Sequence, residues 1–101
     1  MSAYFALLLI HLHFPEGSDL KGKRKELQSI KSQLHGRLGA AVAEVDHQDL
    51  WQRSTLAAAL TSGSVAQLEE AADRLERWLE GRCPAGVRVE RTVASLEDLV
   101  A

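Results

Sequence analysis

The chain has 101 residues, close to the commonest size of one domain, so we expect a single domain over residues 1–101. Its formal net charge of −2 gives no overall bias towards nucleic acid or membranes, so any electrostatic recognition must be local. With one cysteine, Cys83, an intrachain disulfide and a four-thiolate zinc site are both excluded. The apolar run over residues 3–10 is short and follows no Lys or Arg; we therefore expect no signal peptide, no membrane association and a cytoplasmic location.

The first half of the chain predicts a strand, a helix and a second strand. Residues 4–14 end in an alternation of apolar residues with His11 and His13, and this period of two is typical of a strand. Asp19 is a favourable N-cap for a helix over about residues 20–38. The apolar residues of this helix recur at spacings of three and four: Leu27, Ile30, Leu34 and Leu38. Residues 40–45 then predict a short second strand.

The second half predicts a strand, a longer helix and a last strand. Residues 53–61 alternate between two faces, although alanine is a poor strand former and this prediction depends on its context. Ser64 can cap a helix that Gly81 and Pro84 end. Its apolar stripe is the most regular in the chain: Val65, Leu68, Ala72, Leu75 and Leu79. Residues 87–93 predict the last strand, and residues 95–101 a short amphipathic helical tail.

The order strand, helix, strand, strand, helix, strand predicts the fold. Two βαβ-like halves of this length close most economically as a ferredoxin-like α/β sandwich of the α+β class. Its four-stranded antiparallel sheet should have the spatial order 4-1-3-2, with both helices on one face. If Leu8, Ile10 and Leu12 face the helices, an apolar set faces outwards: Phe5, Leu7, Leu9, Ala57 and Ala59. Such a surface needs covering, so we expect a homodimer packed through this face or the sheet edge, unless the tail covers part of it.

Polar side chains are densest in residues 44–53, EVDHQDLWQR, which connect the second and third strands and which we call the signature hairpin. In the predicted topology this hairpin shares one end of the molecule, the rim, with His11, His13 and the start of the first helix. Its polar and aromatic members are Glu44, Asp46, His47, Gln48, Asp49, Trp51 and Gln52.

The start of the first helix carries four cations in five positions: Lys21, Lys23, Arg24 and Lys25. A helix N-terminus already has positive partial charge, so cations there are misplaced unless a partner offsets them. Asp46 and Asp49, or acids of a partner chain, are one such partner. Alternatively, the backbone N–H groups and cations together bind phosphate, such as that of RNA, or the charges are simply solvated.

Three hypotheses for function follow. In the first, a non-enzymatic protein contacts RNA phosphates through the basic helix start and Arg53, with Trp51 stacking on a base; the third strand has no aromatic residue, which disfavours the usual sheet-face mode. In the second, Asp46, His47 and Asp49 bind a small ligand or metal, or form an active site. No tight metal motif, glycine-rich phosphate loop or clear nucleophile–base pair is present, so we expect no cofactor, no metal and no catalytic residue. In the third, the signature hairpin is mainly a dimer interface anchored by Trp51.

Residues 43–59, AEVDHQDLWQRSTLAAA, closely resemble the pattern AEVDHQDLWQRATLGVA of the YlxP-like family, small bacterial proteins carrying a domain of unknown function. Residues 19–24, DLKGKR, resemble the family's SLKEKR, and His13 and Pro15 match the end of its first strand. The resemblance implies a ferredoxin-like fold. Family genes often lie beside those for translation initiation and ribosome-maturation factors, which implies RNA or a ribosome-associated partner.

This chain departs from the family's Ser-x-x-Glu capping box, because Asp19 keeps the cap while Gly22 loses the reciprocal glutamate. The helix start therefore becomes more basic, and less stable by roughly 1 kcal/mol. The leading hypothesis is a small bacterial accessory protein, non-enzymatic and dimeric, that contacts RNA or a ribosome-associated partner through the rim.

Overall fold

Apolar periodicity and two side-chain caps set the boundaries of the elements. The computed structural model describes residues 1–14, 19–47, 50, 52–83 and 86–100. Within these ranges, the elements in chain order are β1 (Tyr4–His13), α1 (Leu20–Gly36), β2 (Ala41–Asp46), β3 (Arg53–Ser62), α2 (Val65–Arg82), β4 (Val87–Ser95) and α3 (Leu96–Val100).

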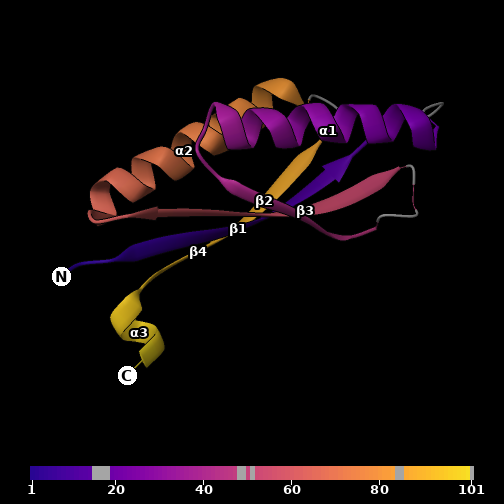
Figure 1. Cartoon of the computed structure of the whole chain (residues 1–101). Coiled ribbons are helices and arrows are strands. Elements are labelled where there is room, and N and C mark those ends of the chain that lie inside the picture. The colour runs from indigo at the N-terminus through magenta and orange to yellow at the C-terminus, as the bar shows by residue number, and fades with distance from the viewer. Residues whose placement is uncertain (15–18, 48–49, 51, 84–85, 101) are drawn as a thin grey trace.

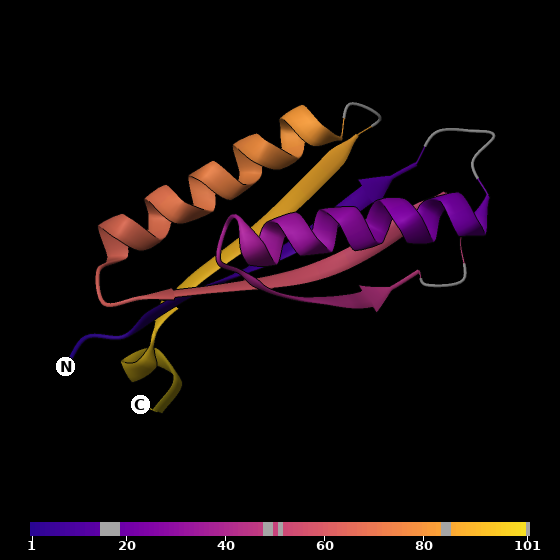
Figure 2. The ribbon, with the colours of Figure 1, turned by 45° about the horizontal axis from the view of Figure 1, so that its top comes forward.

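The four strands form one antiparallel sheet in the order β2-β3-β1-β4 (Figure 1). Helices α1 and α2 both cover the same face of this sheet, as the turned view in Figure 2 also shows. This arrangement is the ferredoxin-like α+β sandwich. The predicted fold class, strand order and placement of the helices are therefore confirmed.

Both long helices begin at the predicted capping residues. The Asp19 carboxylate accepts a hydrogen bond from the Gly22 N–H at 2.7 Å, and the Ser64 hydroxyl accepts one from the Gln67 N–H at 3.3 Å. A Cβ at position 22 would lie 3.1 Å from the Asp19 carboxylate oxygen. Gly22 therefore gives room for a close cap while lacking the side chain of a capping box.

The core lies between the helices and the helix-facing side of the sheet. Ala6, Leu8 and Ile10 of β1 are fully buried, because alternate residues of this strand point towards the helices. The other layer of the core comes from α1 and α2: Leu27, Ile30, Leu34, Leu68, Ala72, Leu75 and Leu79. Among the described residues, none of the helices combines the length and the apolar character needed to span a membrane.

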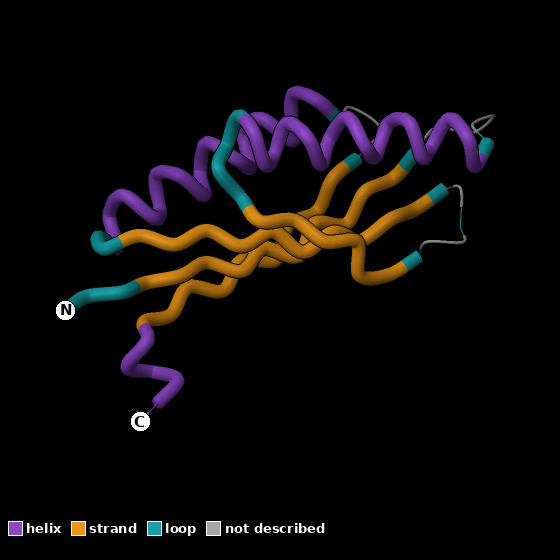
Figure 3. Tube along the Cα trace, in the orientation of Figure 1, coloured by secondary structure: helices purple, strands orange, loops and turns teal. Residues whose placement is uncertain are grey.

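The opposite side of the sheet, which we call the open face, carries neither α1 nor α2. Figure 3 shows the short helix α3 on this side, beside the N-terminal end of β1. The Leu96 N–H donates to the Ala3 carbonyl at 2.9 Å, which fixes the start of α3 there. Leu99 and Val100 of α3 are 66% and 73% exposed, so most of their apolar surface contacts no other part of the described chain.

Candidate functional site

The structure brings the predicted rim together at one end of the molecule. The ends of β1, β2 and β3 that adjoin the signature hairpin lie beside the start of α1 (Figure 2). The Phe14 N–H donates to the Gln52 carbonyl at 2.8 Å, and the His13 N–H donates to the Gly86 carbonyl at 3.2 Å. These two bonds tie the end of β1 to the signature hairpin and to the segment that leads into β4. Gln48, Asp49 and Trp51 of the signature hairpin lie outside the described residues.

Lys23 occupies a different position from the one expected of a phosphate contact. Its side chain is fully buried, and its ammonium donates to the carbonyl of His47 at 2.7 Å and to the carbonyl of Leu50. An ammonium tolerates burial when such acceptors replace water. The expected contact between Lys23 and external phosphate is therefore corrected: Lys23 holds the signature hairpin against α1 from inside.

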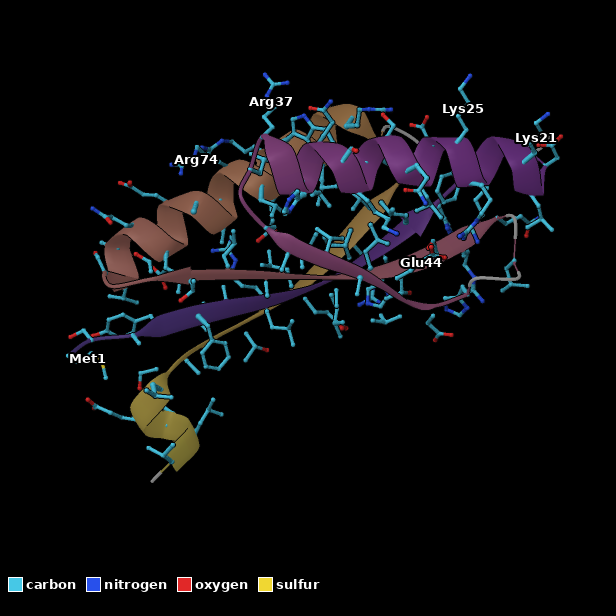
Figure 4. All side chains as sticks on the ribbon, viewed as in Figure 1. Met1, Lys21, Lys25, Arg37, Glu44 and Arg74 are labelled. Carbon is cyan, nitrogen blue, oxygen red and sulfur yellow. The ribbon has the colours of Figure 1, made fainter. Side chains whose placement is uncertain are left out.

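Arg24 is also engaged within the molecule. Its guanidinium donates to both carboxylate oxygens of Glu44, at 2.9 Å and 2.5 Å, which is the bidentate geometry of a strong ion pair. Figure 4 shows Glu44 on the sheet beneath α1. The Arg24 guanidinium lowers the pKa of Glu44 below the 4.5 of an unperturbed glutamate, against the opposing effect of burial. This pair joins α1 to β2, next to the signature hairpin.

The start of the signature hairpin is shaped by its own side chains and backbone. A bulge interrupts the pairing of β2 with β3 between Glu44 and Asp46, and His47 has a φ of 62°, in the left-handed region. The Asp46 carboxylate accepts from the His47 N–H at 2.8 Å. The His47 carbonyl accepts from the Leu50 N–H at 3.2 Å, as well as from Lys23. Asp46 thus bonds the backbone of the next residue through one carboxylate oxygen, while its other oxygen is near the His47 ring.

Three cations at the rim remain exposed: Lys21, Lys25 and Arg53. None of them has an ion-pair partner within the part of the chain that the structure describes. Lys21 and Lys25 point outwards from α1, away from the sheet (Figure 4). Arg53 begins β3 and pairs with His13 on the open face, so the sheet lies between it and the two lysines of α1. The rim therefore presents cations on both of its sides.

On the open face, the rim end of the sheet contains a pocket with a volume of about 520 Å³. Its polar lining comes from β1, β3, β4 and the residue after β2: His11, His13, His47, Arg53, Ser54, Thr55 and Arg88. The His11 ring lies 3.2 Å from the Thr55 hydroxyl and 3.3 Å from the Glu90 carboxylate, which also accepts from Arg88 at 2.8 Å. Arg88 lowers the pKa of Glu90 below 4.5, with a smaller contribution from His11.

The ligand, metal or enzyme hypothesis required Asp46, His47 and Asp49 to converge on one point. His47 Nε2 lies 3.6 Å from an Asp46 carboxylate oxygen, so these two are neighbours, while Asp49 is outside the described residues. In the part of the chain that is described, no group of three or more His, Cys, Asp or Glu side chains could hold a metal ion. His47 instead joins a pocket of basic groups.

The site is thus a basic rim on a ferredoxin-like α+β sandwich. The chain belongs to the family described as "Protein of unknown function (DUF503)", whose model matches residues 5–95. It is 27% identical over 82 residues to "Uncharacterized protein YlxP" of Bacillus subtilis (strain 168), covering 81% of this chain and 85% of that protein. The resemblance to the YlxP-like family is therefore confirmed.

Solved structures also resemble this chain. The de novo designed protein Foldit4 has a TM-score of 0.61 at 10% identity, over 91% of this chain and 96% of that one. The crystal structure of a dimeric ferredoxin-like protein from an uncultured marine organism has a TM-score of 0.41 at 16% identity, over 93% of this chain and 89% of that one. At 10% identity the likeness to Foldit4 concerns the fold alone.

The sequence interpretation overlooked Thr55, Arg88 and Glu90, which belong to the pocket or to its hydrogen bonds. Each was readable from the predicted topology, because β1 pairs His11 with Thr55 on one side and with Arg88 on the other. The alternation of β4 places Arg88 and Glu90 on the same face as His11. Residues that pair across neighbouring strands share a face of the sheet, so the face of His11 also predicts the face of its partners on β3 and β4.

Lys23→Met should destabilise the fold by about 2 kcal/mol, because the His47 and Leu50 carbonyls lose a buried donor that the apolar side chain cannot replace. Urea unfolding followed by circular dichroism measures this change. Lys25→Met, at an exposed position of the same helix, is the matched control and should change stability by less than about 0.5 kcal/mol. Equal effects of the two substitutions would contradict the internal role of Lys23.

The Arg24–Glu44 pair should produce a defined pH dependence of stability. Because the folded-state pKa of Glu44 is lowered, its stabilisation is present above about pH 4.5 and is lost as the pH falls through the folded-state pKa. Glu44→Gln should therefore reduce stability by about 1 kcal/mol at neutral pH and flatten the loss of stability in acid. Urea unfolding at a series of pH values measures both effects. The acid limb should keep its slope in Lys25→Met, which removes a charge that is exposed.

Proposed function

We propose that this protein is a non-enzymatic accessory protein that contacts RNA through the rim, as part of a ribosome-associated complex. The observation that carries the proposal is the set of exposed cations at the rim, with Lys21 and Lys25 on α1 and Arg53 on the open face of the sheet. The whole chain has a net charge of −2, so this local concentration of positive charge runs against the composition. Phosphate contacts of this kind supply sequence-independent affinity for RNA.

The internal contacts of the rim support this proposal, because they distinguish the cations that are used within the fold from those that remain exposed. Lys23 and Arg24 orient the signature hairpin and β2, while Lys21 and Lys25 project into solvent. Helix α2 lies beside α1 and has the opposite charge balance, since residues 65–82 contain five acids and only three arginines. RNA is therefore favoured at the start of α1 and repelled along α2. Trp51, on the signature hairpin, is the proposed stacking platform for a base.

RNA binding is tested with a labelled single-stranded RNA by fluorescence anisotropy at about 50 and 200 mM salt. Replacing Lys21 and Lys25 together by Glu should weaken binding at least about tenfold. It should also reduce the slope of log K against log salt concentration by the amount expected for the loss of about two phosphate contacts. Arg37→Glu, at the opposite end of α1, is the matched control and should have little effect. Binding that ignores salt, or that survives the double charge reversal, would refute the proposal.

Trp51 gives this experiment a second, non-electrostatic arm. If its ring stacks on a base, Trp51→Ala should weaken RNA binding about fivefold or more at both salt concentrations and leave the salt slope unchanged. The same variant separates the RNA proposal from the hypothesis that the signature hairpin is mainly a dimer interface, because a folded monomer would favour the interface. Light scattering measures the mass of the variant.

A homodimer through the apolar part of the open face is the second proposal. Phe5, Leu7 and Leu9 of β1 project onto this face, and Leu7 is 42% exposed although it lies in a central strand. On the β4 side this face is polar, since Thr92 pairs with Leu7 and Glu90 with Leu9. On the other side of Leu7 and Leu9, β3 and β2 present only small apolar residues: Ala41, Ala43, Ala57 and Ala59. Such a flat apolar surface allows the close approach of an identical one, and a two-fold dimer buries both at once.

Leu7→Glu should convert the dimer to a monomer, because it places a charge at the centre of the proposed interface. The matched control is Val65→Glu, since Val65 is 44% exposed at the start of α2, away from the open face. Light scattering at micromolar concentration gives the mass, and circular dichroism confirms that both variants fold. A wild-type monomer at that concentration, or a dimeric Leu7→Glu variant, would contradict this geometry.

A further inference from the structure

The pocket on the open face has a lining of one chemical character. Among the described residues that line it, every ionisable side chain is basic: His11, His13, His47, Arg53 and Arg88. No acid belongs to this lining, although the chain as a whole has a formal net charge of −2 with its histidines neutral. A concave surface of one sign concentrates the field inside it, so the pocket selects for an anion.

The donors reach the pocket from several strands, which gives them different directions. Arg53 begins β3 and is paired with His13, while Arg88 lies in β4 and is paired with His11 on the other side of β1. The two arginines therefore flank the two histidines. Thr55 adds a hydroxyl beside His11, at 3.2 Å from the ring. Donors arranged around a central strand can bind an anion from several sides, whereas a single arginine donates hydrogen bonds to one side of it.

Glu90 shows that part of this set already converges on an anionic group. One carboxylate oxygen of Glu90 lies 2.8 Å from an Arg88 nitrogen, and the other lies 3.3 Å from His11 Nε2. Glu90 is exposed at the border of the pocket and is an internal competitor for these two donors. On the other side, Arg53 and His13 have no ion-pair partner in the described part of the chain. The Asp46 carboxylate also lies 3.6 Å from His47 Nε2, so two acids border the lining. Neither of them pairs with Arg53, whose charge is therefore not balanced within the described part of the chain.

The size and charge of the pocket indicate the class of ligand. Its volume of about 520 Å³ falls in the range of small-molecule sites, roughly 300–1,000 Å³, and exceeds the needs of a bare inorganic ion. A carboxylate is planar and is satisfied by one guanidinium fork, but a phosphate monoester has three terminal oxygens and nearly two charges. Leu9 and Ala57 lie next to the polar residues on the open face of β1 and β3, so an organic group attached to the phosphate meets apolar side chains there, with Glu90 of β4 at their border.

We propose that this pocket binds a phosphate monoester of mononucleotide size, held by Arg53 and Arg88 from the two sides of β1 and by His13 between them. A free mononucleotide and the 5′-phosphate end of an RNA present the same chemistry to these groups. The pocket shares Arg53 with the proposed RNA contact but does not rest on it, because Lys21 and Lys25 lie on the outer side of α1.

The test is a titration of the full-length, isotope-labelled protein by NMR. Adenosine monophosphate should shift the resonances of His13 and Thr55 saturably, whereas adenosine and acetate at matched ionic strength should not. Arg88→Gln and His13→Gln should each weaken binding of the monophosphate at least about fivefold, since each removes a donor to a charged group. Glu90→Gln should strengthen binding, because it removes the competing carboxylate. Arg37→Gln is the control and should leave binding unchanged.

Two further arms identify the source of the phosphate and separate the two proposals. A short RNA with a 5′-phosphate that shifts the same resonances more strongly than its 5′-hydroxyl counterpart and the mononucleotide would identify an RNA end as the ligand. No shift from either RNA would identify the mononucleotide, and equal shifts from both RNAs would contradict the recognition of a phosphate monoester. The Lys21→Glu, Lys25→Glu double variant should keep its affinity for adenosine monophosphate. The pocket proposal fails if adenosine or acetate matches the monophosphate, if Arg37→Gln is as harmful as Arg88→Gln, or if Glu90→Gln weakens binding. Positions 13, 88 and 90 are exposed, so these variants should fold, and thermal unfolding checks that they do.

Discussion

The buried ammonium of Lys23 is the interaction on which the rim depends. It takes the carbonyls of His47 and Leu50 as acceptors, so the backbone of the signature hairpin replaces the water that a charged group needs. A buried ammonium without acceptors would cost free energy. The start of α1, which positions Lys23, and the fold of the signature hairpin against α1, which positions the two carbonyls, therefore depend on each other. Arg24 and Glu44 repeat this link one residue further along α1. The basic helix start is therefore partly structural, which explains how cations persist at a helix end that disfavours them.

The fold followed from the sequence because its two periodicities are clean. Alternation in β1 and the apolar stripes of the helices determine which side of each element is buried, and the βαββαβ order then leaves few topologies. The role of Lys23 was also within reach. It lies four residues before Leu27, so it continues the buried stripe of α1 by one turn, and a lysine on that stripe must find acceptors. The sequence interpretation grouped Lys23 with the exposed cations because of its charge, although its position on the helix places it on the buried side.

Other parts of the site depend on geometry that no local pattern encodes. The left-handed backbone of His47 and the bulge before it turn the ring of this residue into the pocket, yet neither glycine nor a recognised turn motif marks the position. The polar side chains of β4 gave no indication of the pocket in the sequence, for a different reason. Arg88 and Glu90 belong to an edge strand, where alternating charges are ordinary, and they acquire meaning only when the register sets them beside His11.

The open face changes character along β1, and this change connects the proposals. Leu7 and Leu9 give way to His11 and His13 on the same face, so apolar and basic surfaces meet within one strand. A two-fold dimer that set the pockets opposite each other would bring like charges together, at a cost in free energy. A two-fold axis near Leu7 instead lets apolar surface meet apolar surface and places the two pockets at opposite ends. The alternation of β1 buries Ile10 and Leu12 on the inner side, and on the outer side the change from leucine to histidine along the strand separates the proposed dimer surface from the proposed anion pocket.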